Sequence, residues 1–386
     1  MSAPSAEQPT RRGGRARARS WALLLACGTA LLVGCSTPAE RPPVRTVPPA
    51  EARAMIERLM PASVADRPGW ARDIYAALAT LDIAPTAANA CAVLAVIEQE
   101  STYRVDPPVP GLPTIAWSEI DKQADRLGVP RLVVRTALRL SSPTGKSYAE
   151  RIDAVKTEKQ LSDVFDDFIE MVPLGKTFFA SRNPVRTGGP MQVSIAFAEQ
   201  QAARKTYPYP RQGSWRDEVF TRRGGLYFGI AHLLDYAAPY EYPLYRFADF
   251  NAGRYASRNA AFQNAVSTAS GIPLALDGDL LPPNAANDAP RGATELAAAS
   301  LAGKLDMSVA AVRDDLERGP QADFERTRLY QRTMALAGRL NGTPMPTAVV
   351  PRITLHSPKI TRELTTDWFA RRVNDRYKRC VAQDGS

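Results

Sequence analysis

A carboxylate closes the most apolar helical stretch of the chain, which begins at Cys91 and ends at Glu100. At about 100° per residue, Glu100 shares a helix face with Val93 and Val96, whereas Glu98 points about 160° away. A carboxyl group held against apolar surface loses hydration in its charged form, which raises its pKa toward the range useful to a general acid at neutral pH. Glu100 is therefore a candidate acid, and the simpler alternative is a surface Glu that ends a helix.

Other residues suited to catalysis are scarce. His232 lies in an apolar helical pattern, where a core or groove-wall position is the simpler interpretation, and His356 lies near prolines and is expected to be exposed. Two histidines and two unassigned cysteines scattered along the chain argue against a metal site. A phosphate loop at 142–147 is excluded because Leu140 stands where that motif needs glycine. The sequence predicts no metal, no cofactor and no serine nucleophile in an elbow motif.

The N-terminus has the layout of a secretory signal peptide. Five arginines precede the apolar run from Trp21 to Val33, which is too short to span a bilayer comfortably. The run ends in Leu32-Val33-Gly34-Cys35, which resembles the lipobox of bacterial lipoproteins, in which the cysteine is acylated and becomes the new N-terminus. The resemblance implies a signal peptide over 1–34, a lipid on Cys35 and, with Ser36 next, an outer-membrane location.

The composition of the chain is that of an ordinary soluble globular protein. The chain has 386 residues, 45% of them hydrophobic and 23% charged, and a formal net charge of +9. Cleavage before Cys35 removes five Arg and one Glu, a change of −4, which leaves +5. This charge is compatible with an acidic polymer or a lipid surface but is too small to indicate nucleic-acid binding.

The two cysteines left after processing are Cys91 and Cys380. In an oxidising periplasm such a pair often forms a disulfide, which here would tie the C-terminal segment to the helix that carries Glu100. Two unpaired buried thiols are the alternative. Residues 35–50 are rich in proline and are predicted to form an extended tether between the lipid and the folded part.

The remaining chain is predicted to be mainly α-helical, because no segment alternates in the two-residue period of a strand. Thr86 is a plausible cap for the helix that carries Glu100. A tight turn at 188–193 leads into a further helical pattern. The predicted helices cover 50–60, 69–81, 87–100, 117–140, 158–171, 194–204, a stretch that carries Trp215 and Phe220, 225–236, 245–253, parts of 294–340, and 361–380.

Three short motifs occur in order: Glu100-Ser101, Gly189-Pro-Met-Gln-Val193 and Phe250-Asn-Ala-Gly253. Together they resemble the motif set of the lysozyme-like lytic transglycosylases, whose pattern runs Glu-Ser, Gly-Leu-Met-Gln and Tyr-Asn-Ala-Gly. The apolar helix 225–236 also resembles the family's helix that precedes the last motif. The resemblance covers roughly 85–260.

The resemblance implies a single catalytic acid/base, which corresponds to Glu100. It implies that the acid protonates the glycosidic oxygen and that the 6-hydroxyl of the same muramic sugar attacks the anomeric carbon, so no second carboxylate is needed. The implied product end is 1,6-anhydromuramoyl, and the implied partner is the peptidoglycan glycan strand. The implied substrate-binding residues are Ser101, Met191, Gln192, Tyr227 and Asn251.

The chain departs from that pattern in three ways. Pro190 replaces the usual leucine, and Phe250 replaces tyrosine, which removes a hydroxyl near the predicted site. The interval between the first two motifs is unusually long, so 104–186 is predicted to be a helical insertion. The predicted organisation is a lysozyme-like domain over 51–275, a linker rich in proline, asparagine and aspartate, and a C-terminal helical region over 294–386.

The whole chain also resembles a family of bacterial outer-membrane lipoproteins known only as a domain of unknown function. Three hypotheses follow. The first is a lipid-anchored lytic transglycosylase. The second is a catalytically inactive lysozyme-like lipoprotein that binds the wall or an envelope partner, and the third is a muramidase that uses water.

Overall fold

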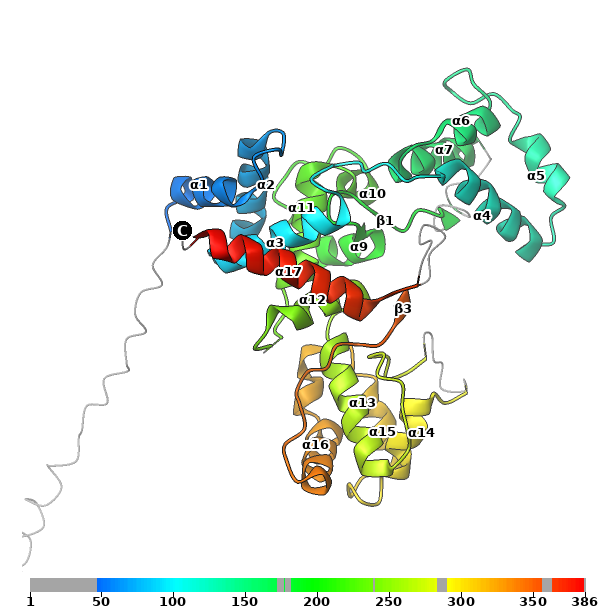
Figure 1. The fold of residues 1–386 in the computed structure, drawn as a ribbon. Helices are drawn as coiled ribbons and strands as arrows, with labels where there is room; N and C mark the ends of the chain where they lie inside the picture. Colours follow the sequence, from blue (N-terminus) through cyan, green and yellow to red (C-terminus); the bar gives the residue numbers. More distant parts are fainter. Residues whose placement is uncertain are drawn as a thin grey trace, which may run out of the picture. The chain divides into compact units, whose positions relative to one another are not determined.

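The computed structural model describes residues 47–171, 177, 182–238, 240–282, 290–355 and 363–384. The described chain is mainly helical, as the sequence predicts (Figure 1). Cys35, His356 and the expected signal peptide lie outside the described residues. No helix among those described is both long enough and apolar enough to cross a bilayer.

The first half of the chain supplies the helix that carries Glu100 and a group of helices within the predicted insertion. Its helices are α1 (Pro49–Leu59), α2 (Arg67–Thr80), α3 (Ala87–Glu100), α4 (Leu112–Arg126), α5 (Arg131–Ala137), α6 (Tyr148–Ala154) and α7 (Glu158–Met171). A two-stranded antiparallel hairpin follows, with β1 (Thr187–Gly188) paired to β2 (Val193–Ser194).

The second half continues with further helices and a second short hairpin, β3 (Thr354–Leu355) with β4 (Leu364–Thr365). Its helices are α9 (Ile195–Arg204), α10 (Trp215–Val219), α11 (Arg222–Leu234), α12 (Pro243–Ala252), α13 (Ala256–Ser270), α14 (Ala293–Ser300), α15 (Val309–Leu316), the 3-10 helix η2 (Ala322–Arg326), α16 (Arg328–Asn341) and α17 (Thr366–Asp384).

Local capping explains several of these boundaries. Thr86 caps α3, because its hydroxyl accepts from the backbone N of Asn89 at 3.2 Å. Ser194 caps α9 in the same way through Phe197 N at 3.3 Å. Helix α6, which the sequence analysis did not predict, begins at a full capping box between Ser147 and Glu150.

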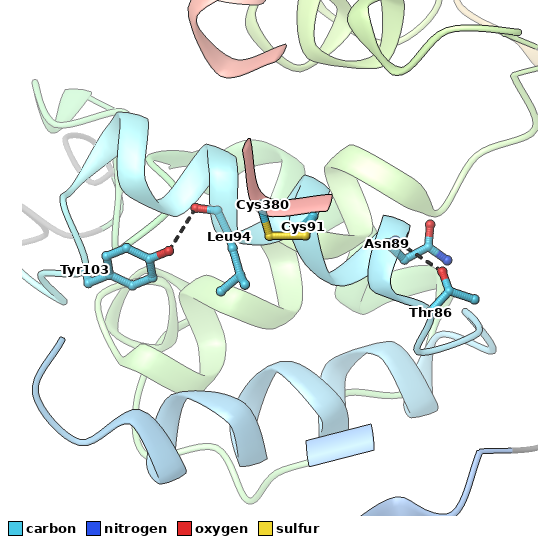
Figure 2. Close-up of a disulfide and its surroundings, with 6 residues drawn as sticks. All are labelled: Thr86, Asn89, Cys91, Leu94, Tyr103 and Cys380. Carbon is cyan, nitrogen blue, oxygen red and sulfur yellow. Dashed lines mark hydrogen bonds between the residues drawn. A yellow bond between two sulfur atoms is a disulfide. The ribbon is translucent and has the colours of Figure 1, made fainter. Parts of the chain in front are cut away.

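A first hydrophobic cluster, called here the main core, is built around α3. Residues 90–97 of α3 are all buried, and side chains of α1, α2, α11, α12 and α17 pack on them or on their neighbours. Helix α17 contacts both α3 and α12, so the C-terminus returns to the helix that carries Glu100 (Figure 1). The disulfide expected from the cysteine count joins Cys91 to Cys380 across this contact (Figure 2).

Two further clusters lie outside the main core. One joins α13 to α14, α15 and α16, with Phe262, Phe324 and Leu329 among its fully buried side chains. Residues 294–384 therefore contribute to two different clusters. Helices α14, α15 and α16 pack with α13, whereas α17 belongs to the main core. The other cluster, called here the insertion lobe, contains α4, α5, α6 and α7 and is centred on Tyr148 and Ile152. The described part of residues 104–186 thus contains four helices that share a hydrophobic cluster, which also includes Phe220 from outside this range.

Candidate functional site

Glu100 is the last residue of α3 and is half-buried. The buried run of α3 ends at Ile97, so the packing of α3 in the main core fixes the backbone from which the Glu100 side chain projects. Glu98 points elsewhere, as the helical spacing predicts, and pairs with Arg376 of α17 at 3.1 Å. The raised pKa expected for Glu100 stays a prediction.

The chain reverses directly after Glu100. Ser101 ends the helix, with both its backbone N and its hydroxyl donating to the carbonyl of Ile97 at 3.0 Å. Thr102 and Tyr103 then both adopt positive φ, 51° and 58°. Two consecutive left-handed residues other than glycine are uncommon and cost roughly 1–3 kcal/mol each. Tyr103 is held in place by its hydroxyl, which donates to Leu94 O at 3.3 Å (Figure 2).

The second motif forms the turn of the β1–β2 hairpin. Gly189 has φ +72°, and a Cβ there would lie 2.2 Å from Val219 O, so only glycine fits. Met191 is fully buried in the main core and packs against Gly229 of α11. A Cβ added to Gly229 would lie 2.5 Å from the Sδ of Met191. Gln192 is half-buried with φ +48°, and its amide donates to Gly189 O at 3.3 Å.

The third motif ends α12 at Gly253, which has φ +108°. Asn251 is exposed, and its Oδ1 accepts from the hydroxyl of Thr366 at 3.0 Å, which links it to the start of α17. Tyr255, two residues beyond the motif, also has a positive φ of 67°. All three motifs therefore lie at, or next to, an unusual backbone conformation.

A buried carboxylate holds the chain that follows the third motif. Asp249 is 1% exposed and accepts from the hydroxyls of Tyr236 and Tyr240 and from the backbone N of Tyr255 and Ser257. Burial raises the pKa of Asp249, although these hydrogen bonds oppose the rise. The role of Asp249 is structural, and an acidic residue within a helix gave no sequence signal for it.

Three of the expected substrate-binding residues are not available to a ligand. Tyr227 is fully buried, and its hydroxyl donates to Thr206 O at 3.1 Å. Met191 is fully buried on α11, and Ser101 is 5% exposed and bonded within its own helix. The prediction that these three side chains contact sugar is wrong, because the main core and the helix end use them for packing and capping. Glu100, Gln192 and Asn251 remain accessible.

The structure links these three residues through shared neighbours. The hairpin that carries Gln192 packs on α11, and α11 contacts α3, whose last residue is Glu100. Helix α12, which carries Asn251, contacts α17, and α17 lies along α3. The three motifs are therefore arranged around one core.

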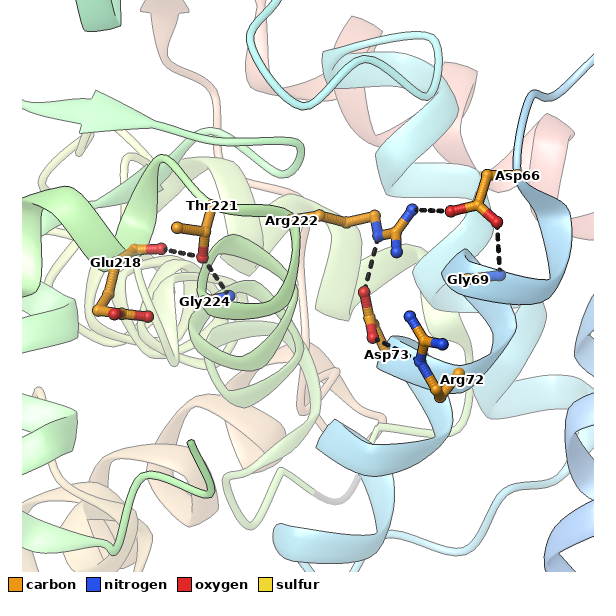
Figure 3. Close-up of polar contacts among 8 residues, drawn as sticks. All are labelled: Asp66, Gly69, Arg72, Asp73, Glu218, Thr221, Arg222 and Gly224. Carbon is orange, nitrogen blue, oxygen red and sulfur yellow. Dashed lines mark hydrogen bonds and ion pairs between the residues drawn. The ribbon is translucent and has the colours of Figure 1, made fainter. Parts of the chain in front are cut away.

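An ion-pair cluster that the sequence analysis missed connects α2 to the start of α11. Arg222 donates from Nε to Asp73 and from a terminal nitrogen to Asp66, each at 2.7 Å (Figure 3). The ion pair lowers the pKa of the exposed Asp66. The Arg222 guanidinium also lies over the ring of Trp70, 5.5 Å from its centroid. The residues lie about 150 positions apart, so no local pattern could have paired them.

His232 lies between the rings of Phe197 and Phe250, as a core or groove-wall residue would. Its Nε2 is 3.2 Å from Phe250 O, and its buried Nδ1 has no hydrogen-bond partner among the residues described. Burial, together with the charge of Arg254, lowers the pKa of His232 to about 4. The imidazole is therefore neutral at physiological pH. Across the described ranges, no group of three or more His, Cys, Asp or Glu residues is placed to bind a metal.

Comparison with known proteins assigns a family. A model of the family described as "Protein of unknown function (DUF1615)" matches residues 63–383. The chain belongs to the DUF1615 family. It is 54% identical over 353 residues to the uncharacterized protein YaiW of Escherichia coli (strain K12), an alignment that covers 92% of this chain and 96% of that protein. No solved structure matches the chain. The DUF1615 family brings no assigned function, so the likeness to lytic transglycosylases stays a prediction.

Proposed function

We infer that this DUF1615 protein is a lipid-anchored enzyme of the cell envelope that cleaves the MurNAc-GlcNAc β-1,4 bond of peptidoglycan as a lytic transglycosylase, with Glu100 as its only acid/base. The observation that carries the proposal is the position of Glu100. It is half-buried at the end of a helix enclosed by the main core and is followed at once by two left-handed residues. Such backbone conformations cluster at active sites.

The proposed reaction needs one carboxyl group in two protonation states. The Glu100 carboxyl donates its proton to the glycosidic oxygen as the bond from that oxygen to the anomeric carbon breaks. The 6-hydroxyl of the same muramic residue then forms a bond to the anomeric carbon and gives its proton to the Glu100 carboxylate. The leaving sugar departs with a free hydroxyl, the other end is a 1,6-anhydro sugar, and Glu100 returns to its acid form.

Gln192 and Asn251 are proposed to hold the glycan strand. Each is accessible and carries an amide, which can donate to and accept from sugar hydroxyls. Gln192 lies on a turn whose conformation depends on Gly189, and Asn251 is oriented by Thr366. The lipobox-like segment that ends at Cys35 supports placing the enzyme at the outer membrane.

A second candidate function is a wall-binding lipoprotein without catalysis. Two observations favour it: Phe250 stands where the transglycosylase motif has tyrosine, and Asn251 already has a hydrogen-bond partner within the chain. In this alternative the same surface binds glycan strands but cleaves none.

Digestion of purified peptidoglycan separates the two candidates. The substrate is incubated with the chain that begins at Ser36, since the described unit begins at Val47. Released fragments are then identified by mass spectrometry. Anhydro-muropeptides from the wild type and none from Glu100→Gln support the enzyme. Fragments with reducing muramic ends indicate hydrolysis by water instead.

The matched control is Glu98→Gln on the same helix, whose carboxylate pairs with Arg376 and points away from Glu100. It is expected to release anhydro-muropeptides like the wild type. No fragments from any of the three proteins, with sedimentation on peptidoglycan retained, would overturn the enzyme and leave the binding protein.

A further inference from the structure

The insertion lobe contains a cavity of about 530 Å³. Small-molecule sites occupy roughly 300–1,000 Å³ and are lined mainly by apolar side chains. The apolar lining comes from all four helices of the lobe and from the segment before β1. It includes Leu112 and Ile120 from α4, Ile152 from α6, and Leu161, Phe165 and Phe168 from α7.

The cavity follows the length of a helix. Its lining positions on α4 recur every three or four residues from Leu112 to Leu127, which is one continuous face of the helix. Fifteen residues of helix span about 22 Å at about 1.5 Å per residue. Helix α7 lines the cavity in the same way from Leu161 to Ile169. An elongated apolar space of this kind accommodates a long hydrocarbon chain rather than a compact ring system.

One cation on the cavity wall is available to an anionic head group. Arg182 lines the cavity and is exposed, and its side chain makes no hydrogen bond or ion pair with any residue in the described parts of the chain. The carboxylate of Glu119, which also lines the cavity, already accepts a hydrogen bond from the side-chain amide of Gln123 at 2.9 Å. A guanidinium forms strong, often bidentate hydrogen bonds with a carboxylate.

Helix α5 forms a thin outer wall. Val134 of α5 lines the cavity, as does the buried Leu138 directly after this helix, but α5 itself, described over its whole length, has no buried residue. It is held to α4 by exposed ion pairs, such as Arg135 with Asp121 at 2.8 Å. Exposed pairs of this kind contribute little stability, so α5 can move aside to admit a chain.

We propose that the insertion lobe binds one long-chain fatty acid, with the hydrocarbon chain in the cavity between α4 and α7 and the carboxylate on Arg182. The site is separate from Glu100 and goes beyond the proposed glycan cleavage. Neither activity depends on the other in this proposal, so each can fail without the other.

The first test uses the chain that begins at Ser36, purified without detergent. Mass spectrometry of its organic extract should detect fatty acids in about equimolar amount. After delipidation, calorimetric titration with palmitate should show one saturable site, whereas palmityl alcohol, which lacks the charge, should bind at least about fivefold more weakly. Failure of delipidated protein to bind palmitate would overturn the proposal.

Two pairs of variants locate the site. Arg182→Ala should weaken palmitate binding about fivefold or more, whereas Arg139→Ala, an exposed arginine of the same lobe that does not line the cavity, should leave it unchanged. Ala124→Phe places a ring in the cavity and should weaken binding at least about tenfold. Ser118→Phe adds the same ring to the solvent side of α4 and should not.

Circular dichroism and thermal unfolding verify that each variant is folded. Equal palmitate affinity in Ala124→Phe and Ser118→Phe would exclude this cavity as the site. Equal affinity of the wild type for palmitate and palmityl alcohol, with no effect of Arg182→Ala, would exclude the carboxylate contact.

Discussion

The main core and the insertion lobe are both helical, but they differ in how completely they bury their apolar side chains. Helix α3 buries eight consecutive residues and is tied to α17 by a disulfide. In the lobe, α5 buries none, and several large apolar residues are exposed, with Leu132 at 77%. The helices of the lobe also line a cavity of about 530 Å³ that is partly open to solvent, whereas a well-packed interior leaves few voids larger than a water molecule.

The difference indicates a division of tasks. A general acid needs a fixed position relative to the bond it protonates, and the end of a helix whose central residues are buried fixes the backbone that carries it. A binding cavity needs unfilled space and a wall that can open, which a loosely packed helix provides. The same chain therefore places the candidate acid at the end of a helix with eight consecutive buried residues and the candidate lipid site beside a helix with none.

The largest contrast is expected in activity. Glu100→Gln should lower the rate of anhydro-muropeptide release at least about 100-fold, because general acid catalysis contributes about 10²–10⁴. Glu119→Gln changes a half-buried carboxylate on the cavity wall of the lobe and should leave the rate unchanged. Timed digests of peptidoglycan measure both. A comparable loss in both variants would show that catalysis is not confined to the main core.

Reduction of the disulfide is expected to destabilise the main core. The Cys91–Cys380 bond joins residues 289 positions apart, and removal of a native disulfide typically costs about 2–5 kcal/mol. Urea unfolding with and without dithiothreitol measures the loss. Cys91→Ala/Cys380→Ala should be insensitive to dithiothreitol, and hydrogen exchange in α4 and α5 should change little. A stability that dithiothreitol leaves unchanged would contradict this view of the core.

Truncation of one isoleucine in the main core and one in the insertion lobe compares the packing of the two regions. Ile97→Ala removes a fully buried side chain of the main core and should cost about 3–4 kcal/mol. Ile120→Ala removes a half-buried side chain that already borders the cavity and should cost about 1 kcal/mol, because fewer contacts are lost. Urea unfolding of both variants tests the contrast. Equal costs would mean that the cavity wall is as well packed as the core.

The smallest contrast concerns two aspartates paired with arginine. Arg222 lowers the pKa of Asp66 beside the main core, and Arg131 lowers the pKa of Asp125 in the lobe. Each contribution is complete above about pH 4, the ordinary pKa of aspartate, and is lost as the pH falls through the lowered folded value.

Asp66→Asn should remove part of the acid sensitivity of global unfolding, since Arg222 joins α2 to α11. Asp125→Asn should instead change hydrogen exchange in α5 alone, because its partner Arg131 is the first residue of α5. Urea midpoints at pH 6 and pH 3, together with hydrogen exchange, measure the two effects. A global shift from Asp125→Asn would contradict the local role.

The sequence predicted those helices whose apolar residues repeat with a helical period. It placed α3 at 87–100 with its Thr86 cap and α7 at 158–171, the bounds that the structure has. It missed α13, although this helix is fifteen residues long and buries eleven of them. Polar residues such as Arg258 and Gln263 interrupt its pattern and are buried only because other parts of the chain bond to them.

For the candidate site, the sequence proposed which residues could carry chemistry and predicted that Glu98 and Glu100 lie on different faces of the helix, because helical spacing is a local property. Only the tertiary structure decided that Tyr227, Met191 and Ser101 are buried and that Thr366, more than a hundred residues away, bonds to Asn251. The tertiary structure alone also brings Arg222 to Asp66 and Asp73. It likewise forms the cavity in the insertion lobe. Burial and long-range contacts depend on which helices meet, and that is set by the packing of the whole chain rather than by any single segment.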